Sequence, residues 1–228
     1  MTTSTYVLVP GAGGDAFYWH RVVPLLRDAG HGAVAIDLPA GEDGAGLASY
    51  ADAIAAAMGD HGDVVLVAQS MGAFSAPIAA ARGGVSRIAL VAPMIPVPGE
   101  TPGEFWGASG QGEASRALAV AEGRDPVAPF VLHEMFLHDV PADVAERLLA
   151  HGEGGDEAAS WDDPWPLEAW PEIPTTVIAG ARDRLFPLPY MRALARDRLG
   201  IEDVAVVDSG HLPALSRPEE LTRAILAG

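Results

Sequence analysis

Short apolar runs recur along this chain, and each is bounded by glycine, proline or aspartate. They are rich in β-branched residues and nearly continuous in hydrophobicity, which is typical of strands buried on both faces of a sheet. Helical patterns lie between them. The predicted strands are residues 6–9, 33–36, 64–68, 88–92, 176–179 and 204–207. This alternation predicts an α/β fold with a doubly wound, mainly parallel sheet of about six strands and helices on both faces.

The alternation breaks once, between residues 92 and 176, where about 80 residues separate two strands, far more than a crossover connection needs. Helical patterns cover 126–138 and 141–151, the second with Asp139 as its predicted N-cap and Pro141 in its first turn. We therefore expect an α/β core of residues 1–95 and 167–228. Residues 96–166, called the inserted segment below, are expected to form a helical cap over the sheet.

Two missing residue types narrow the possible chemistry. The chain has no cysteine, which excludes disulfides, thiolate metal sites and thiol nucleophiles. All 14 basic residues are arginine, so Schiff-base chemistry and a P-loop lysine are also excluded. The acidic and histidine residues have no metal-ligand spacing, and the glycines at 11–14 lack the full dinucleotide fingerprint. We expect no metal and no cofactor.

The charge of the chain limits its partners. A net charge of −17 and a pI of about 4.6 disfavour nucleic acid and anionic membrane surfaces. No stretch approaches ~20 apolar residues, and the first residues lack a basic region typical of a signal peptide. We expect a cytoplasmic monomer or homodimer that acts on a small molecule, with no nucleic acid or membrane as partner.

Ser70 lies directly between an apolar strand and a helix of small residues, in the run V-A-Q-S-M-G-A at 67–73. This is a nucleophile-elbow pattern, a strained turn that needs small residues two positions before and two after the serine. Ala68, in place of the usual glycine, and Gly72 meet that need. The turn would expose the Ser70 hydroxyl and leave the Met71 backbone N–H free to donate. The alternative is a serine that caps the helix.

Two further polar residues follow predicted strands. Asp183 lies just past strand 176–179, where a carboxylate could orient an imidazole, and the alternative is a turn aspartate between two arginines. His211 follows the last strand in a glycine-containing loop, although a lone histidine is often structural. Asp208 is too close in sequence to His211 to be the better acid. Asp139 and His138 fit helix termini better than substrate contacts.

The order Ser70, Asp183, His211, each after a parallel strand, is the order of the α/β-hydrolase triad. Through nearly its whole length the chain resembles that family. The opening run V-L-V-P-G-A-G-G at 7–14 is similar to the family's oxyanion loop, with Pro10 in place of the usual histidine. G-A-R-D at 180–183 and S-G-H at 209–211 are similar to its acid and base segments.

The resemblance implies a catalytic triad of Ser70, Asp183 and His211. It also implies an oxyanion hole formed by the backbone N–H groups of Ala12 and Met71, on a trimmed sheet without the wider fold's two leading strands. The short chain and segment 11–19 look most like the branch that holds plant methylesterases and hydroxynitrile lyases.

We therefore expect a serine hydrolase that cleaves an ester or related carbonyl bond of a small apolar molecule through an acyl-enzyme. Two alternatives remain open: a lyase or carbon–carbon hydrolase on the same triad, and a non-catalytic ligand-binding protein of this fold. The expected substrate pocket is apolar and consists of Phe17, Tyr18, Met94, Trp106, Phe130, Phe136, Phe186 and Leu212.

Overall fold

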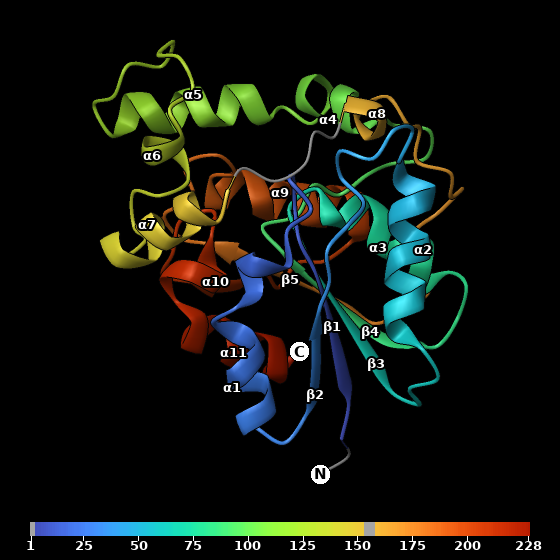
Figure 1. Cartoon of the computed structure of the whole chain (residues 1–228). Coiled ribbons are helices and arrows are strands. Elements are labelled where there is room, and N and C mark those ends of the chain that lie inside the picture. The colour runs from blue at the N-terminus through green and yellow to red at the C-terminus, as the bar shows by residue number, and fades with distance from the viewer. Residues whose placement is uncertain (1–2, 153–157) are drawn as a thin grey trace.

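One six-stranded sheet organises the computed structural model, which describes residues 3–152 and 158–228. All neighbouring strands pair in parallel, in the order β2-β1-β3-β4-β5-β6 (Figure 1). The strands are β1 (Thr5–Val9), β2 (Gly32–Ala35), β3 (Val64–Gln69), β4 (Val85–Val91), β5 (Thr175–Gly180) and β6 (Ala205–Val207). The predicted parallel α/β sheet is confirmed.

Helices cover both faces of the sheet because successive side chains of a strand point to opposite faces. Val7 and Val9 of β1 pack into one apolar cluster, and Tyr6 and Leu8 pack into the other. The first cluster includes side chains of α2 (Leu47–Met58), α3 (Gly72–Ala80) and α9 (Leu188–Leu199). The second includes side chains of α1 (Val22–Asp28) and α11 (Pro218–Ala227), on the other side of the sheet in Figure 1.

The centre of the sheet is fully buried where the chain enters the predicted elbow. Every residue of β3 is buried, and so is every residue of α3, which follows it. The small side chains of α3 let this helix pack closely against the strands. The carboxyl end of β3 is therefore held rigidly between β1 and β4.

The inserted segment, of which residues 153–157 lie outside the described residues, runs between β4 and β5. Figure 1 shows its helices above the carboxyl ends of the strands. They are α4 (Pro102–Ala108), α5 (Gln111–Ala121), α6 (Leu132–Met135), α7 (Ala142–His151) and α8 (Ala158–Trp161). A capping box between Thr101 and Glu104 starts α4.

Two local predictions for this segment are wrong. The helix predicted over 126–138 is only the short α6, because proline disfavours helix both at its own position and at the preceding one, and Pro129 interrupts the run. Asp139 does not cap α7, whose N-cap is Pro141. The Asp139 carboxylate is turned toward the core instead, where it accepts a hydrogen bond from the Gly210 backbone N–H.

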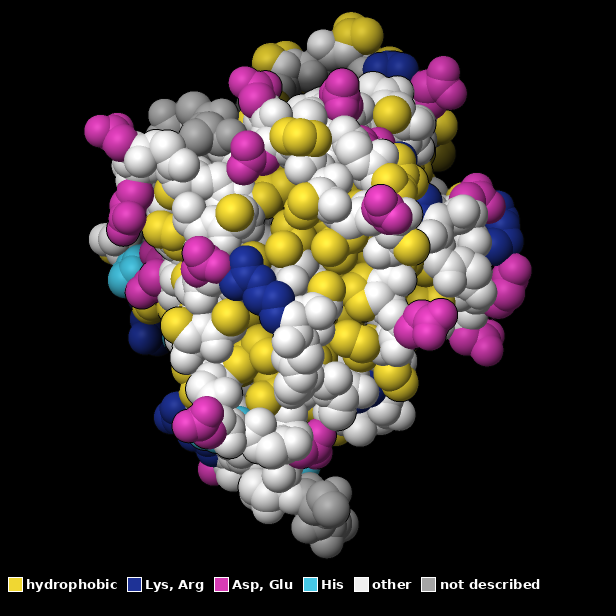
Figure 2. Space-filling model, turned by 90° about the vertical axis from the view of Figure 1, so that its right-hand side faces the viewer, with side chains coloured by type: hydrophobic (Ala, Val, Ile, Leu, Met, Phe, Trp, Pro, Cys, Tyr) yellow, Lys and Arg dark blue, Asp and Glu magenta, His cyan; other side chains and the backbone are white. Residues whose placement is uncertain are grey.

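The surface is strongly acidic. Figure 2 shows acidic side chains spread over one face of the molecule, with few basic side chains among them. None of the helices within residues 3–152 and 158–228 combines the length and hydrophobicity that crossing a membrane requires.

Candidate active site

Ser70 occupies a sharp turn between β3 and α3. Its backbone is in the left-handed region, with φ at 49°, which is unusual for a residue with a side chain. Hydrogen bonds fix it on both sides: its N–H donates to the Val91 carbonyl, and its carbonyl accepts from the Met94 N–H, each at 3.0 Å. A side chain at Gly72 would collide with the Pro10 carbonyl, so this position requires glycine.

Ser70, His211 and Asp183 form a continuous hydrogen-bonded chain. His211 Nε2 lies 3.2 Å from Ser70 Oγ, and His211 Nδ1 lies 2.8 Å from Asp183 Oδ2. The three residues are only 7%, 2% and 1% exposed, respectively. They follow β3, β6 and β5, so the carboxyl ends of three strands bring together residues that are far apart in the sequence.

The Asp183 carboxylate is held by three donors. Its Oδ1 accepts from the backbone N–H groups of Leu185 at 2.8 Å and Phe186 at 2.9 Å, which leaves Oδ2 for the imidazole. An ionised carboxylate is an acceptor only, so Nδ1 of His211 carries the proton. The other ring nitrogen, Nε2, then presents a lone pair toward the Ser70 hydroxyl.

The loop that carries His211 is fixed from several sides. The N–H of Gly210 donates to Asp139 Oδ2 at 2.7 Å, which ties this loop to the inserted segment. The ring of Phe136 stacks on His211 with centroids 5.0 Å apart, and that of Phe186 meets it edge-on at 5.1 Å. A side chain at Gly180 would collide with the carbonyl oxygens of Ser209 and Gly210, so glycine lets β5 approach this loop.

Asp208 has a different environment from Asp183. Its side chain is 66% exposed and pairs with Arg182 Nε at 2.9 Å. Asp208 thus belongs to a surface ion pair beside the loop, and the carboxylate that bonds to the imidazole ring is that of Asp183.

The two expected oxyanion donors lie next to Ser70. Ala12 lines the cavity beside Ser70, and Met71 is the residue directly after Ser70. Within the part of the chain that the structure describes, neither the Ala12 nor the Met71 backbone N–H donates to another protein group. Both are thus available to a bound carbonyl oxygen.

A cavity of about 470 Å³ opens above Ser70 and is mainly apolar. Among the predicted pocket residues, Tyr18, Phe136 and Leu212 line it. Several other residues of the lining were not predicted from the sequence, namely Asp15, Gln69, Leu132, Leu137, Leu148, Leu149 and Leu215. Burial raises the pKa of Tyr18 far above its ordinary range, so this phenol is a neutral part of the wall.

The other predicted pocket residues take different places. Met94 and Phe186 are buried in the core, the latter against His211. Trp106 packs on Phe186 and on two aromatic rings of the inserted segment, those of Phe105 and Trp161. Phe17 lies in stacking contact with two histidine rings, and Phe130 is 60% exposed with its ring edge-on to Phe136.

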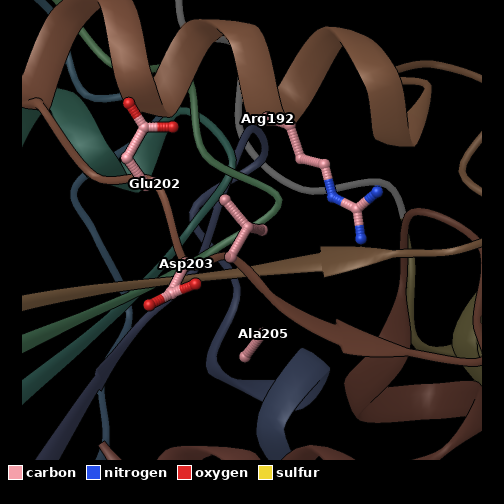
Figure 3. Close-up of a pocket in the computed structure, with 5 residues that line it drawn as sticks. Arg192, Glu202, Asp203 and Ala205 are labelled. Carbon is pink, nitrogen blue, oxygen red and sulfur yellow. The ribbon is translucent and has the colours of Figure 1, made fainter.

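A separate hollow lies beside β6 (Figure 3). Arg192 reaches it from α9, and Glu202 and Asp203 come from the segment before β6. Its lining includes no hydroxyl or imidazole group, so the candidate chemistry lies at Ser70. Within residues 3–152 and 158–228, no group of histidine and carboxylate side chains is arranged to hold a metal ion.

Known proteins share this fold and this sequence pattern. A sequence model of the Alpha/beta hydrolase family matches residues 6–224. Methylesterase 7 from Arabidopsis thaliana is 26% identical over an alignment of 253 positions that covers 97% of this chain and 94% of that protein. A pyrethroid hydrolase from Sphingobium wenxiniae is 27% identical, with coverage of 99% and 87%, respectively.

Solved structures agree in fold. The extracellular alpha/beta-hydrolase from a Paenibacillus species superposes with a TM-score of 0.79 at 16% identity, covering 99% of this chain and 98% of that one. Polyneuridine aldehyde esterase gives a TM-score of 0.76 at 19% identity, with 99% of both chains covered. The sheet order and the geometry of the turn at Ser70 agree with the family match. This protein belongs to the α/β-hydrolase family, because the family model matches nearly the whole chain.

Proposed function

We propose that this protein is a serine hydrolase that cleaves a carboxylic ester of a small apolar molecule. The observation that carries the proposal is the buried hydrogen-bonded chain from Ser70 Oγ through His211 to Asp183, at the floor of an apolar cavity. Serine alone is a weak nucleophile, and an adjacent oriented base is what activates it.

In the proposed reaction, Ser70 Oγ attacks the ester carbonyl while its proton passes to His211 Nε2. Asp183 keeps the proton on Nδ1 and stabilises the resulting imidazolium. The N–H groups of Ala12 and Met71 bind the developing oxyanion, and each such donor contributes on the order of 10²–10³ in rate. His211 then protonates the leaving alcohol as the carbon–oxygen bond breaks. Water attacks the acyl-enzyme by the same route and releases the acid.

The cavity lining supports an apolar, uncharged substrate. Six leucines and the Phe136 ring come together around Ser70, and Asp15 is the one carboxylate in the described lining. An anionic group would meet no arginine among these lining residues. The names of the relatives also support hydrolysis, since one is a methylesterase and another is a pyrethroid hydrolase.

We further propose that the inserted segment serves as the cap of this site. Leu132, Phe136 and Leu137 from α6 and the turn after it, together with Leu148 and Leu149 from α7, supply cavity wall. A roof of this kind excludes water from the acyl-enzyme and shapes specificity, while the reacting groups stay on the sheet.

The test is substitution of Ser70 by alanine, with hydrolysis of a series of p-nitrophenyl esters as the assay. Ser70→Ala should lower kcat/KM by on the order of 10⁴–10⁶, because triad members act as a unit. It should also abolish labelling by a fluorophosphonate probe. Ser86→Ala is the matched control, since this exposed serine bonds to Val64 at the amino end of β3, far from the cavity. Near wild-type turnover in Ser70→Ala would overturn the proposal.

A further inference from the structure

Gln69 is a buried polar residue beside the proposed base. It ends β3, directly before Ser70, and is only 4% exposed in a strand whose other residues are all apolar. Its side-chain Nε2 lies 3.3 Å from His211 Nε2 and 3.5 Å from the His211 carbonyl oxygen. It also lines the catalytic cavity.

The orientation of the Gln69 amide follows from its neighbours. The His211 carbonyl is an acceptor, and His211 Nε2 is also an acceptor because the ring proton is on Nδ1, facing Asp183. The NH₂ group must therefore face His211, since the amide oxygen would meet two lone pairs there. The oxygen points the other way, toward Gly11, where a side chain would overlap it.

Two donors thus compete for one lone pair. The Ser70 hydroxyl is 3.2 Å and the Gln69 NH₂ 3.3 Å from the same ring nitrogen. When that nitrogen takes the serine proton it becomes a donor, and the Gln69 NH₂ then faces an N–H instead of a lone pair. A hydrogen bond to the neutral form of a group disfavours its charged form.

We propose that Gln69 is a positioning residue that holds the neutral imidazole of His211 in place in the resting enzyme and disfavours its protonation. This inference rests on the proposed function. The inference goes beyond that function by predicting that activity persists to lower pH than it would in a triad without such a donor. The reason is that catalysis needs the His211 base in its neutral form.

The other groups around His211 do not supply this effect. Asp183, bonded to Nδ1, favours the protonated ring. Asp139 bonds to Gly210, and its negative charge acts in the same direction. Tyr18 is held neutral by burial, and burial likewise lowers the pKa of the neighbouring His138. The rings of Phe136 and Phe186 carry no charge.

The experiment compares Gln69→Met and Gln69→Glu with the wild type in the pH dependence of kcat/KM. Methionine has a similar length and no donor, and glutamate keeps the shape but accepts instead of donating. The acid limb should move to higher pH by on the order of half a unit in Gln69→Met, and further in Gln69→Glu. Ser86→Ala is the control, because Ser86 bonds to the Val64 carbonyl at the amino end of β3, far from the ring. Its acid limb should stay at the wild-type position.

A second readout does not depend on hydrolysis. In the Ser70→Ala background, the His211 ring can be titrated by nitrogen-15 NMR with and without Gln69→Met, which removes the donor and adds no charge. A midpoint that rises in the double variant supports the inference, even if the substrate assignment fails. If both Gln69 variants leave the acid limb within about 0.2 units of the wild type, or lower it, and Gln69→Met does the same to the NMR midpoint in the Ser70→Ala background, the inference is wrong. A loss of activity in Ser70→Ala with unmoved limbs in the Gln69 variants refutes only the role of Gln69.

Discussion

Replacing Asp183 by asparagine tests how much of the catalysis depends on the orientation of one proton. The asparagine oxygen can take the two backbone bonds from Leu185 and Phe186, both under 3 Å in the wild type. The new NH₂ group is then placed where Oδ2 stood, and it donates to His211 Nδ1. The ring proton moves to Nε2, and the Ser70 hydroxyl loses its acceptor.

The expected loss follows from that tautomer. A triad with the ring in the wrong tautomer loses on the order of 10⁴ in kcat. This corresponds to about 5.5 kcal/mol in the activation barrier, at 1.36 kcal/mol for each factor of ten. The free energy of unfolding of Asp183→Asn should stay close to that of the wild type, because the backbone N–H groups of Leu185 and Phe186 keep an acceptor. Asp183→Ala should be equally inactive but less stable by about 1–3 kcal/mol for each backbone N–H left without a partner.

The assay is kcat/KM on the best p-nitrophenyl ester, with urea unfolding of each variant. Asp208→Asn is the control, because the Asp208–Arg182 pair is exposed and such pairs contribute roughly 0–1 kcal/mol. Asp183→Asn within tenfold of the wild type, or a larger loss in Asp208→Asn, would refute the assignment of the acid. Equal unfolding free energies for Asp183→Asn and Asp183→Ala would refute the account of the backbone bonds.

Three further predictions concern the inserted segment. Asp139→Ala should lower kcat about tenfold or more and reduce the unfolding free energy by about 1–3 kcal/mol, because the buried Gly210 N–H loses its acceptor. Asp139→Asn keeps an acceptor and should stay close to the wild type, and similar losses in both would contradict this reason. Phe136→Ala should change the ranking of short against bulky acyl esters, because Phe136 lines the cavity. Trp106→Ala should lower the melting temperature and reduce all ester rates by one common factor, since Trp106 packs on other aromatic rings. Ester panels that show the reverse pattern would contradict the assignment of these two side chains.

Much of the sheet could be predicted from the sequence because its strands are buried on both faces. Such strands are continuous apolar runs, and the run 64–68 makes up all but the last residue of the buried strand β3. The same pattern placed Ser70, Asp183 and His211 at strand ends. Carboxyl ends of parallel strands meet at one edge, so the sequence also predicted that these side chains come together.

The cavity wall could not be predicted in the same way, because it depends on how the inserted segment docks. Composition marks Trp106 and Leu149 equally as apolar, but Trp106 packs among aromatic rings and Leu149 faces the cavity. Asp139 has no sequence signal for its bond to Gly210, 71 positions away. Gln69 did carry a signal: it is a polar residue that ends a fully apolar strand and directly precedes the predicted nucleophile.

The sheet and the inserted segment position different members of the proposed triad. The Ser70 backbone is bonded to Val91 and Met94, at the end of β4. The loop after Asp183 is bonded by the inserted segment: Gln111 Nε2 donates to Leu185 O at 2.6 Å, and Ser115 Oγ donates to Arg184 O at 3.1 Å.

The loop of His211 is likewise bonded to the inserted segment, through Asp139. A nucleophile fixed by the core and an acid and base fixed partly by the insertion have a physical consequence. Sequence changes in residues 96–166 can adjust the alignment of the base without disturbing the strained turn at Ser70. Specificity and proton transfer are then coupled through the same segment, because the side chains that form the cavity wall belong to the element that holds the two proton-handling loops in place.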